Sequence, residues 1–285
     1  MTTVTLLHPG AMGVAIGAQA ARSGATVLWF PAERSAATKA RAEAAGLTPA
    51  ADLPTALAAS DIVLSVCPPA AAEDVAAIVA SHAFNGVYVD ANAISPERMR
   101  RIADRQQAQG ATPVDGAIIG PAPRGTATAR LYLAGHTPAV TQAAALFTGT
   151  QVTARPLDKP LGAASALKMA FGGYQKAART LAAVSHALAA THDVTEELTA
   201  EGRTMAAAVL ADTDYLPSVA ARAWRWGPEM HEVANALREA GLPPDLAQAA
   251  ATTMQHWNRD KDKNNLTLED TLTHLRSTSH DAHHD

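Results

Sequence analysis

The first half of the chain alternates short apolar runs with longer segments rich in alanine. The runs at residues 4–7 and 26–30 enclose a helical stretch at 11–22, which is the pattern of a β-α-β unit in a parallel sheet. Further strands are predicted at 61–66, 86–90, 112–115, 130–134 and 150–153, with helices at 70–82 and 96–109. The pattern therefore predicts a large, mainly parallel α/β sheet.

The strand pattern ends near residue 156, and the rest of the chain has a helical pattern. Residues 161–190 are rich in Ala and Leu and predict one long buried helix, interrupted only by Gly172 and Gly173. Further helices are predicted at 194–210, 215–239 and 244–257. We therefore expect two domains, an α/β domain at 1–156 and an all-α domain at 157–285, joined by the helix at 161–190.

Composition narrows the classes of partner. Hydrophobic residues make up 48% and charged residues 18%, which excludes a mainly disordered protein. The net charge of -4 disfavours nucleic acid and anionic membranes, and the apolar runs are too short to cross a bilayer. A single cysteine and an N-terminus without a signal-peptide pattern favour a cytoplasmic location. We expect a small-molecule ligand.

Three histidines, His280, His283 and His284, lie in the last residues of the chain. They could bind a metal, or they could belong to a solvated tail. No second ligand cluster with suitable spacing accompanies them, so we interpret them as a tail and predict no metal site.

The first predicted strand leads into the sequence HPGAMG at 8–13 and then into an apolar helix. In a Rossmann-type fold, glycines at this turn let backbone N–H groups and the helix N-terminus approach a pyrophosphate. Gly10 and Gly13 match the second and third glycines of GxGxxG, whereas His8 occupies the first position. The context predicts a cofactor-binding turn, with a tight turn that binds nothing as the alternative. The predicted cofactor-binding residues here are Gly10, Ala11, Met12 and Gly13.

The end of the second predicted strand bears on the choice of cofactor. NAD-binding proteins usually place an acidic residue there for the ribose hydroxyls, but this strand ends Trp29-Phe30-Pro31. Arg34 and Ser35 follow at the start of a helix and suit the 2'-phosphate of NADP. Glu33 is a competing signal for NAD, and Arg34 could be a solvated helix residue. We predict NADP, with NAD as the alternative.

The next two strands also end in candidate residues, because ligands of open α/β sheets bind at the carboxyl ends of strands. Cys67 and Pro68 follow one strand and are predicted to pack beside the cofactor. A reactive thiol is the alternative for Cys67, but the sequence shows no cationic neighbour. Asn92 follows the other strand and could bind the nicotinamide ribose or the substrate, or cap a turn.

Four motifs carry a resemblance that spans nearly the whole chain. They are PGAMG at 9–13, DGAIIGP at 115–121, GAASALKM at 162–169 and WRWGPEM at 224–230. With these motifs the chain resembles the β-hydroxyacid dehydrogenase superfamily, which includes 6-phosphogluconate and 3-hydroxyisobutyrate dehydrogenases and the related imine reductases. The likeness is greatest to the branch with a DUF1932 C-terminal domain.

The resemblance implies an NADP-dependent oxidoreductase that transfers a hydride between nicotinamide C4 and a carbonyl or hydroxyl carbon. Lys168 matches the family's catalytic lysine, the expected general acid/base. Burial beside an apolar cofactor would lower the pKa of such a lysine, whereas a lysine that only snorkels from a buried helix is the alternative. The resemblance also implies a homodimer through the helical domain.

The sequence departs from the family at two positions of the expected substrate site. Gly172 stands where the family usually has Asn, and we expect Gln175 or Arg179 to substitute on the same helix face. Ile119 stands where the hydroxyacid enzymes have Ser. These departures argue against a simple hydroxyacid as substrate.

The remaining predicted substrate contacts come from two segments. Gly120 keeps a backbone donor, and Arg124 is a nearby candidate anion ligand. Trp226 and Met230 belong to a segment that could line the pocket or pack between helices, and His231 comes next and could contribute acid-base chemistry. Two alternative functions stay open. One is an imine reductase, although that group commonly has Asp or Tyr in place of the lysine. The other is a sensor that binds NADP without turnover.

Overall fold

The computed structural model describes residues 1–32, 34–204 and 208–276. The chain divides into two compact units, Met1–Met169 and Ala170–Asp285. The division falls within α7 (Ala163–Ala190), which coincides with the long helix predicted at 161–190. Neither glycine of the Gly172-Gly173 pair interrupts this helix.

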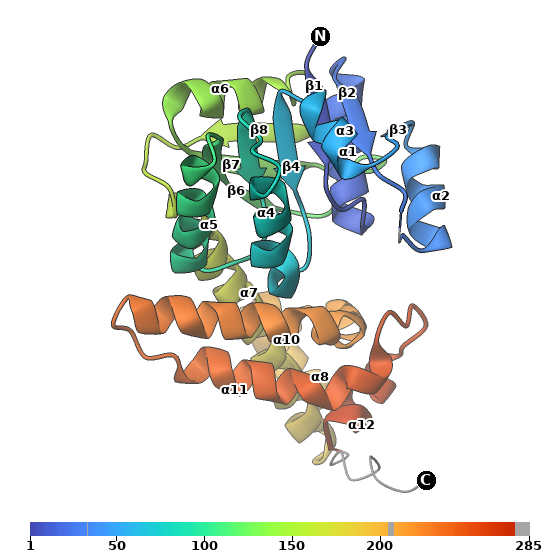
Figure 1. Cartoon of the computed structure of the whole chain (residues 1–285). Helices are drawn as coiled ribbons and strands as arrows, with labels where there is room; N and C mark the ends of the chain where they lie inside the picture. The colour runs from blue at the N-terminus through green and yellow to red at the C-terminus, as the bar shows by residue number, and fades with distance from the viewer. Residues whose placement is uncertain (33, 205–207, 277–285) are drawn as a thin grey trace, which may run out of the picture. The chain divides into compact units, whose positions relative to one another are not determined.

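An eight-stranded sheet forms the centre of the first unit (Figure 1). The strands lie in the order β3-β2-β1-β4-β5-β6-β7-β8. The first six pair in parallel, whereas β7 runs antiparallel to β6 and β8 runs parallel to β7. The strands are β1 (Thr3–Leu6), β2 (Thr26–Trp29), β3 (Thr48–Pro49), β4 (Ile62–Ser65), β5 (Val87–Asp90), β6 (Thr112–Ile119), β7 (Ala129–Gly135) and β8 (Val152–Pro156). The predicted α/β class with a mainly parallel sheet is confirmed.

Helices cover both faces of this sheet because its strands carry apolar side chains on both sides. In β4, Ile62 and Leu64 pack into one core and Val63 into the other, as the alternation of side chains along a strand requires. The first core includes residues of α1 (Ala11–Arg22), α2 (Ala36–Ala44) and α6 (Thr137–Ala145). The second includes residues of α3 (Leu53–Ala58), α4 (Ala72–Ala80) and α5 (Pro96–Ala108), with η1 (Pro69–Ala71) leading into α4.

Strand β6 is longer than the sequence predicts. The apolar pattern is broken by Asp115 and Gly116, so the predicted strand ended at Asp115, which was wrong: the ladder with β7 continues to Ile119. A carboxylate inside a sheet is tolerated where donors satisfy it, and the first residues of α7 do so here. The short elements β3 and α3 and the helix α6 were also not predicted.

The second unit is helical. Its elements after α7 are α8 (Thr195–Thr204), α9 (Ala208–Ala211), η2 (Thr213–Tyr215), α10 (Leu216–Glu239), α11 (Asp245–Met254), η3 (Gln255–Asp260) and α12 (Leu268–Arg276). Gly173 lets α7 and α10 approach closely, since a Cβ there would lie 2.8 Å from Cγ1 of Val233. The helix predicted at 244–257 ends at Met254 and continues as η3. The predicted helix at 194–210 corresponds to α8 and α9, which flank residues 205–207 outside the described ranges.

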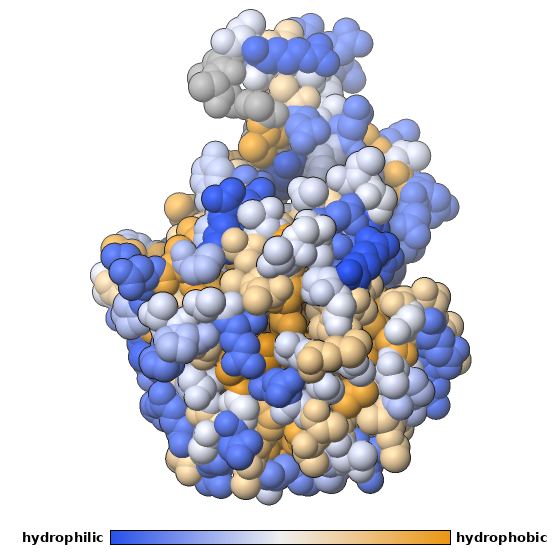
Figure 2. Space-filling view, turned by 90° about the horizontal axis from the view of Figure 1, so that it is seen from above, coloured by the Kyte–Doolittle hydropathy of each residue, from blue (hydrophilic) through white to orange (hydrophobic). Residues whose placement is uncertain are grey.

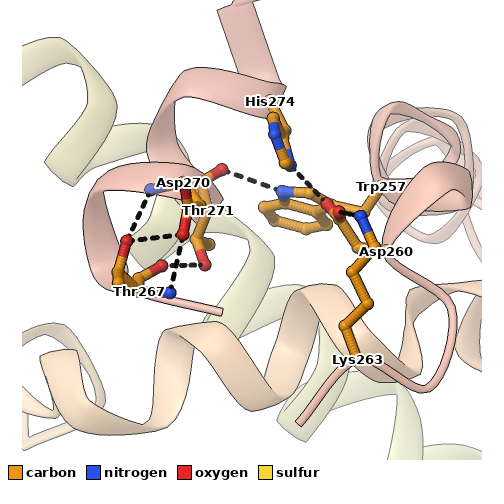
Figure 3. Close-up of polar contacts among 7 residues, drawn as sticks. All are labelled: Trp257, Asp260, Lys263, Thr267, Asp270, Thr271 and His274. Carbon is orange, nitrogen blue, oxygen red and sulfur yellow. Dashed lines mark hydrogen bonds and ion pairs between the residues drawn. The ribbon is translucent and has the colours of Figure 1, made fainter. Parts of the chain in front are cut away.

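A polar cluster fastens α12 to η3 (Figure 3). Trp257 is fully buried and its Nε1 donates to the Thr271 carbonyl at 2.9 Å. The buried carboxylate of Asp260 contacts His274 Nδ1 at 2.6 Å and Lys263 Nζ at 3.2 Å. Contacts to a buried carboxylate are costly to break, so this cluster holds the last described helix in place.

The beginning of α12 is set by a reciprocal capping box between Thr267 and Asp270. The backbone N–H of Asp270 donates to Thr267 Oγ1 at 3.1 Å, and the Thr267 N–H donates to Asp270 Oδ2 at 3.0 Å. Hydrogen bonds from Thr267 lower the pKa of Asp270. The histidine tail, which includes His280, His283 and His284, lies outside the described residues.

The surface and the helices bear on the expected partners. On the face shown in Figure 2, hydrophobic residues occur in small groups among hydrophilic ones. Within the described ranges, the helices are all too short or too polar to cross a membrane.

Candidate active site

The carboxyl ends of four neighbouring strands meet at one edge of the first unit. Strands β1, β4, β5 and β6 are adjacent and parallel, so the residues that follow each of them come together. The strand order reverses between β1 and β4, and open α/β sheets bind ligands at such a switch point. The turn at 8–13 and the predicted site residues Cys67, Pro68 and Asn92 all lie at this edge.

The turn between β1 and α1 is built for close backbone approach. Gly10 is the N-cap of α1 and makes no side-chain capping bond, and the first turn of the helix carries no acidic residue. A Cβ on Gly13 would clash with the His8 carbonyl oxygen, so only glycine lets the strand and helix meet there. Backbone N–H groups at a helix N-terminus are a good fit for a diphosphate, and these residues suit that part of a dinucleotide.

Arg34 lies against this turn. Its Nη2 donates to the Leu7 carbonyl at 2.9 Å, its Nη1 lies 3.1 Å from His8 Nδ1, and its guanidinium sits 4.9 Å from the centre of the Phe30 ring. The predicted partner Ser35 caps α2 by accepting from the Thr38 N–H at 3.3 Å. The competing residue Glu33 lies outside the described residues. The geometry therefore brings a guanidinium next to the turn between β1 and α1.

Asn92 links the ends of β4 and β5. Its Nδ2 donates to Ser65 Oγ and to Asp90 Oδ2, both at 3.0 Å, and its Oδ1 accepts from the Cys67 N–H at 2.6 Å. These bonds connect residues at the ends of β4 and β5, which resembles the turn-capping role that the sequence offers as the alternative for Asn92. Its contact with a cofactor remains a prediction.

Cys67 and Pro68 lie at the carboxyl end of β4, with Pro68 as the N-cap of η1. Burial, followed by the charge of Asp90, raises the pKa of the Cys67 thiol to about 12. The thiol is therefore protonated at neutral pH, which agrees with a packed residue rather than a reactive one.

Two buried carboxylates stand side by side on β5 and β6. Asp90 and Asp115 are register partners, and both are almost inaccessible. Burial raises the pKa of Asp90 to about 7. The hydrogen bond from the Asn92 N–H lowers this pKa, and the charge of Asp115 raises it. Burial also raises the pKa of Asp115, opposed mainly by hydrogen bonds from Ser165. Asp90 is thus poised to gain or lose a proton near neutrality.

Asp115 fixes the first turn of α7. Its Oδ2 accepts from the Ala164 N–H at 2.8 Å, and its Oδ1 accepts from Ser165 Oγ at 2.7 Å. A carboxylate that satisfies N-terminal N–H groups also interacts favourably with the helix dipole. The same contacts tie α7 to β6 and so determine where the next turn of the helix lies.

Lys168 is on that next turn. Its Nζ donates to the Ile118 carbonyl at 2.7 Å, which holds the ammonium at the carboxyl end of β6. Ile119 and Gly120 follow directly; the Ile119 side chain is buried, and Gly120 has a positive φ of 120°. Arg124 instead donates from Nη2 to the Ala11 carbonyl at 3.1 Å, at the start of α1. The structure thus brings Lys168 to Ile119 and Gly120, and brings Arg124 to the turn between β1 and α1.

The second unit explains the glycine at position 172. A Cβ on Gly172 would lie 3.1 Å from Lys176 Nζ, so the ammonium fills the space that a larger residue would need. Lys176 is buried, forms an ion pair with Glu229 at 2.9 Å and lies 5.7 Å from the centre of the Trp226 ring. The polar group next to Gly172 is therefore Lys176, which the sequence reasoning missed.

The two residues that were expected to substitute at this place differ in their surroundings. Arg179 pairs with Asp212 at 3.0 Å and stacks at 3.7 Å on Tyr215. Gln175 is half-buried on α7. Arg179 is thus engaged in a contact of its own, and its substitution for the family Asn stays a prediction.

The predicted liners on α10 face different neighbours. Trp226 and Glu229 both contact Lys176 of α7. Met230 is fully buried. His231 lines a pocket of about 220 Å³ between α10 and α11. The other residues of this pocket include Trp224, Gly227, Pro228 and Met254. A helix separates positions 226 and 231 onto different faces, so the structure does not bring these two side chains together.

Asp90 and Glu229 are further residues that the sequence reasoning missed. A charged residue at the end of an apolar strand run, as in the VYVD of β5, was the available signal for Asp90. For Glu229 the signal was its position in the motif at 224–230. In the parts of the chain that the structure describes, no three His, Cys, Asp or Glu side chains gather as metal ligands would.

These features define a dinucleotide-binding α/β protein with a helical second part. The family model described as the NAD binding domain of 6-phosphogluconate dehydrogenase matches residues 3–154, and the one described as a domain of unknown function, DUF1932, matches residues 189–257. The first covers more than half of the 285 residues, so the chain belongs to this NAD(P)-binding family, within the β-hydroxyacid dehydrogenase superfamily. The resemblance drawn from the motifs is confirmed.

Solved structures share the fold. The 3-hydroxyisobutyrate dehydrogenase of Mycobacterium tuberculosis, in a structure with L-serine, has a TM-score of 0.75 at 18% identity and covers 97% of this chain and 100% of its own. A conserved protein of unknown function, described as similar to 3-hydroxyacid dehydrogenases, has a TM-score of 0.68 at 23% identity and covers 90% of this chain and 98% of its own. A reductive aminase of Aspergillus terreus in complex with NADPH and ethyl-5-oxohexanoate has a TM-score of 0.58 at 21% identity and covers 91% of this chain and 94% of its own. No curated protein matches this sequence.

The buried Asp90 generates a prediction about stability and pH. The pKa of an unfolded aspartate is about 4, so the folded protein binds more protons between about pH 4 and pH 7, and the stability this gives is lost as pH rises through about 7. Relative to Asp90→Asn, the wild type should lose melting temperature between about pH 4 and pH 7 and lose little more above that range. Asp104→Asn, at an exposed position of α5, is the control. Equal pH dependence of wild type and Asp90→Asn in thermal melts would contradict this assignment.

Proposed function

We propose that the protein is an NADP-dependent oxidoreductase that transfers a hydride between NADP(H) and a hydroxyl or carbonyl group of a small molecule, with Lys168 as general acid/base. The observation that carries the proposal is the 2.7 Å hydrogen bond from Lys168 Nζ to the Ile118 carbonyl. It holds an ammonium at the sheet edge where the phosphate turn also lies. Family membership supports a nicotinamide dinucleotide as the cofactor, and the ammonium of Lys168 at this edge of the sheet supports the proton transfer.

The bound nicotinamide dinucleotide would supply or accept the hydride. The backbone of residues 10–13 would hold its diphosphate, with Arg124 adding a positive charge beside Ala11. Lys168 Nζ would donate a proton to the carbonyl oxygen in reduction, or accept the hydroxyl proton in oxidation. The Ile118 carbonyl would orient the lysine, because the ammonium keeps one of its donors on that oxygen.

Arg34 supports NADP over NAD. A guanidinium held by the Leu7 carbonyl and by His8 stands beside the end of β2, where the adenosine ribose of a dinucleotide lies in this fold. The 2'-phosphate distinguishes the two cofactors, and guanidinium groups bind phosphate strongly.

An imine reductase is the second candidate, because a reductive aminase shares the fold. Lys168 favours the hydroxyl or carbonyl reaction, since imine reductases commonly carry Asp or Tyr at that position. A cofactor sensor is the third candidate and predicts binding without turnover. Screening ketones, hydroxyacids and cyclic imines for NADPH consumption or NADP reduction separates the three.

Replacement of Lys168 tests the proposed proton transfer. Lys168→Met removes the acid/base while keeping most of the side-chain volume, so kcat should fall by at least about 100-fold. The Kd for NADPH should stay within about twofold, because the diphosphate contacts are elsewhere. Lys159→Met, at an exposed position before α7, is the matched control. Turnover that survives in Lys168→Met would rule out the acid/base role, and a wild type that binds NADPH but turns over no compound would favour the sensor.

Replacement of Arg34 tests the cofactor. Arg34→Ala should raise the Kd for NADPH about tenfold or more, because a charge-assisted contact to the 2'-phosphate is lost, and should leave the Kd for NADH nearly unchanged. Arg105→Ala, on the exposed side of α5, should alter neither constant. Fluorescence titration with both cofactors measures this. An unchanged preference in Arg34→Ala would mean that another group recognises the phosphate, or that NAD is the cofactor.

We also propose a homodimer through the helical unit, supported by an exposed apolar stripe on α7. The stripe comprises Phe171, Tyr174, Leu181 and Val184, which are 42% to 66% exposed. Their spacing places them on one side of the helix. Leu181→Glu should shift the protein to monomer in sedimentation, whereas Ile78→Glu on α4 should not. A wild type that sediments as a monomer would contradict the proposal.

A further inference from the structure

His8 occupies the place of the first glycine of the phosphate turn, and its ring lies inside the turn. A Cβ on Gly10 would lie 3.2 Å from His8 Cδ2 and 3.4 Å from His8 Nε2, so the ring packs against the Gly10 α-carbon. The side chain is half-buried. The imidazole thus fills space that a glycine at position 8 would leave open.

The contact with Arg34 fixes the protonation state of His8. A guanidinium carries only donors, so in the 3.1 Å contact the Arg34 Nη1 donates and His8 Nδ1 must accept. His8 is therefore neutral, with its proton on Nε2. Burial, and then the charges of Arg34 and Arg41, lower the pKa of His8 and favour the same neutral form.

Three of the contacts that hold the Arg34 guanidinium come from His8, Leu7 and Phe30. They are the His8 Nδ1 contact, the 2.9 Å bond from Nη2 to the Leu7 carbonyl, and the stacking on Phe30 at 4.9 Å. An arginine on the surface loses side-chain entropy when it binds an anion, and fixing it beforehand removes part of that cost. The His8 and Leu7 contacts tie this guanidinium to the turn that would hold the diphosphate.

We propose that His8 is a positioning residue for cofactor selection, which holds Arg34 in the orientation that binds the 2'-phosphate of NADP. The inference rests on the proposed NADP dependence. It assigns a role in specificity to a departure from GxGxxG. His8 acts through Arg34, so its loss should weaken NADPH binding selectively and leave binding of NADH, which lacks the phosphate, nearly unchanged.

Two variants of His8 test this inference. His8→Gly restores the ordinary glycine of the turn and removes the acceptor, so the Kd for NADPH should rise about tenfold while that for NADH stays within about twofold. His8→Asn should recover most of the preference, because the Asn Oδ1 can take the place of the Nδ1 acceptor. His82→Gly, at an exposed position between α4 and β5, should leave both constants unchanged. Fluorescence titration of each full-length variant with NADPH and NADH gives the ratio.

The outcomes separate this inference from the function on which it rests. A wild type that binds neither dinucleotide, or that prefers NADH, contradicts the proposed NADP dependence and this inference with it. A wild type that prefers NADPH, with the same preference in His8→Gly, contradicts this inference alone. An equal loss of NADPH and NADH binding in His8→Gly would mean that His8 shapes the turn and does not orient Arg34. That result would also overturn this inference. Unchanged NADH binding shows that the variant is folded.

Discussion

The position of Lys168 depends on a carboxylate buried within the sheet. Asp115 on β6 accepts hydrogen bonds from the first residues of α7, and an unsatisfied carboxylate in that place would be costly. The helix must therefore begin against β6, and its next turn brings Lys168 to the Ile118 carbonyl on the same strand. One short chain of contacts thus connects the interior of the sheet to the proposed acid/base.

The departures from the family pattern have physical counterparts in the structure. Gly172 leaves space that the Lys176 ammonium occupies, and Glu229 balances its charge. His8 replaces a glycine and packs inside the turn, where it contacts Arg34. At both positions the departure from the family pattern lies next to a charged side chain, Lys176 beside Gly172 and Arg34 beside His8.

The sequence predicted the mainly parallel sheet and the long helix, because apolar periodicity and small residues determine such elements locally. It also predicted that the motif at 9–13 lies in the turn from β1 into α1 and that Lys168 lies on the long helix, whereas the roles of these residues stay predictions. It did not predict the full length of β6, since Asp115 looks unfavourable in a strand until its partners on α7 are known. Nor could it tell what Trp226 and His231 each contact, because that depends on which elements pack against the two faces of α10. What sequence missed is set by contacts between residues far apart in the chain.

A crystal structure of the protein with NADPH bound would test the central claim most directly. The account predicts the diphosphate against the backbone of residues 10–13, the 2'-phosphate on Arg34, and the nicotinamide ring next to Lys168. A dinucleotide bound elsewhere on the protein, or with its nicotinamide away from Lys168, would contradict it.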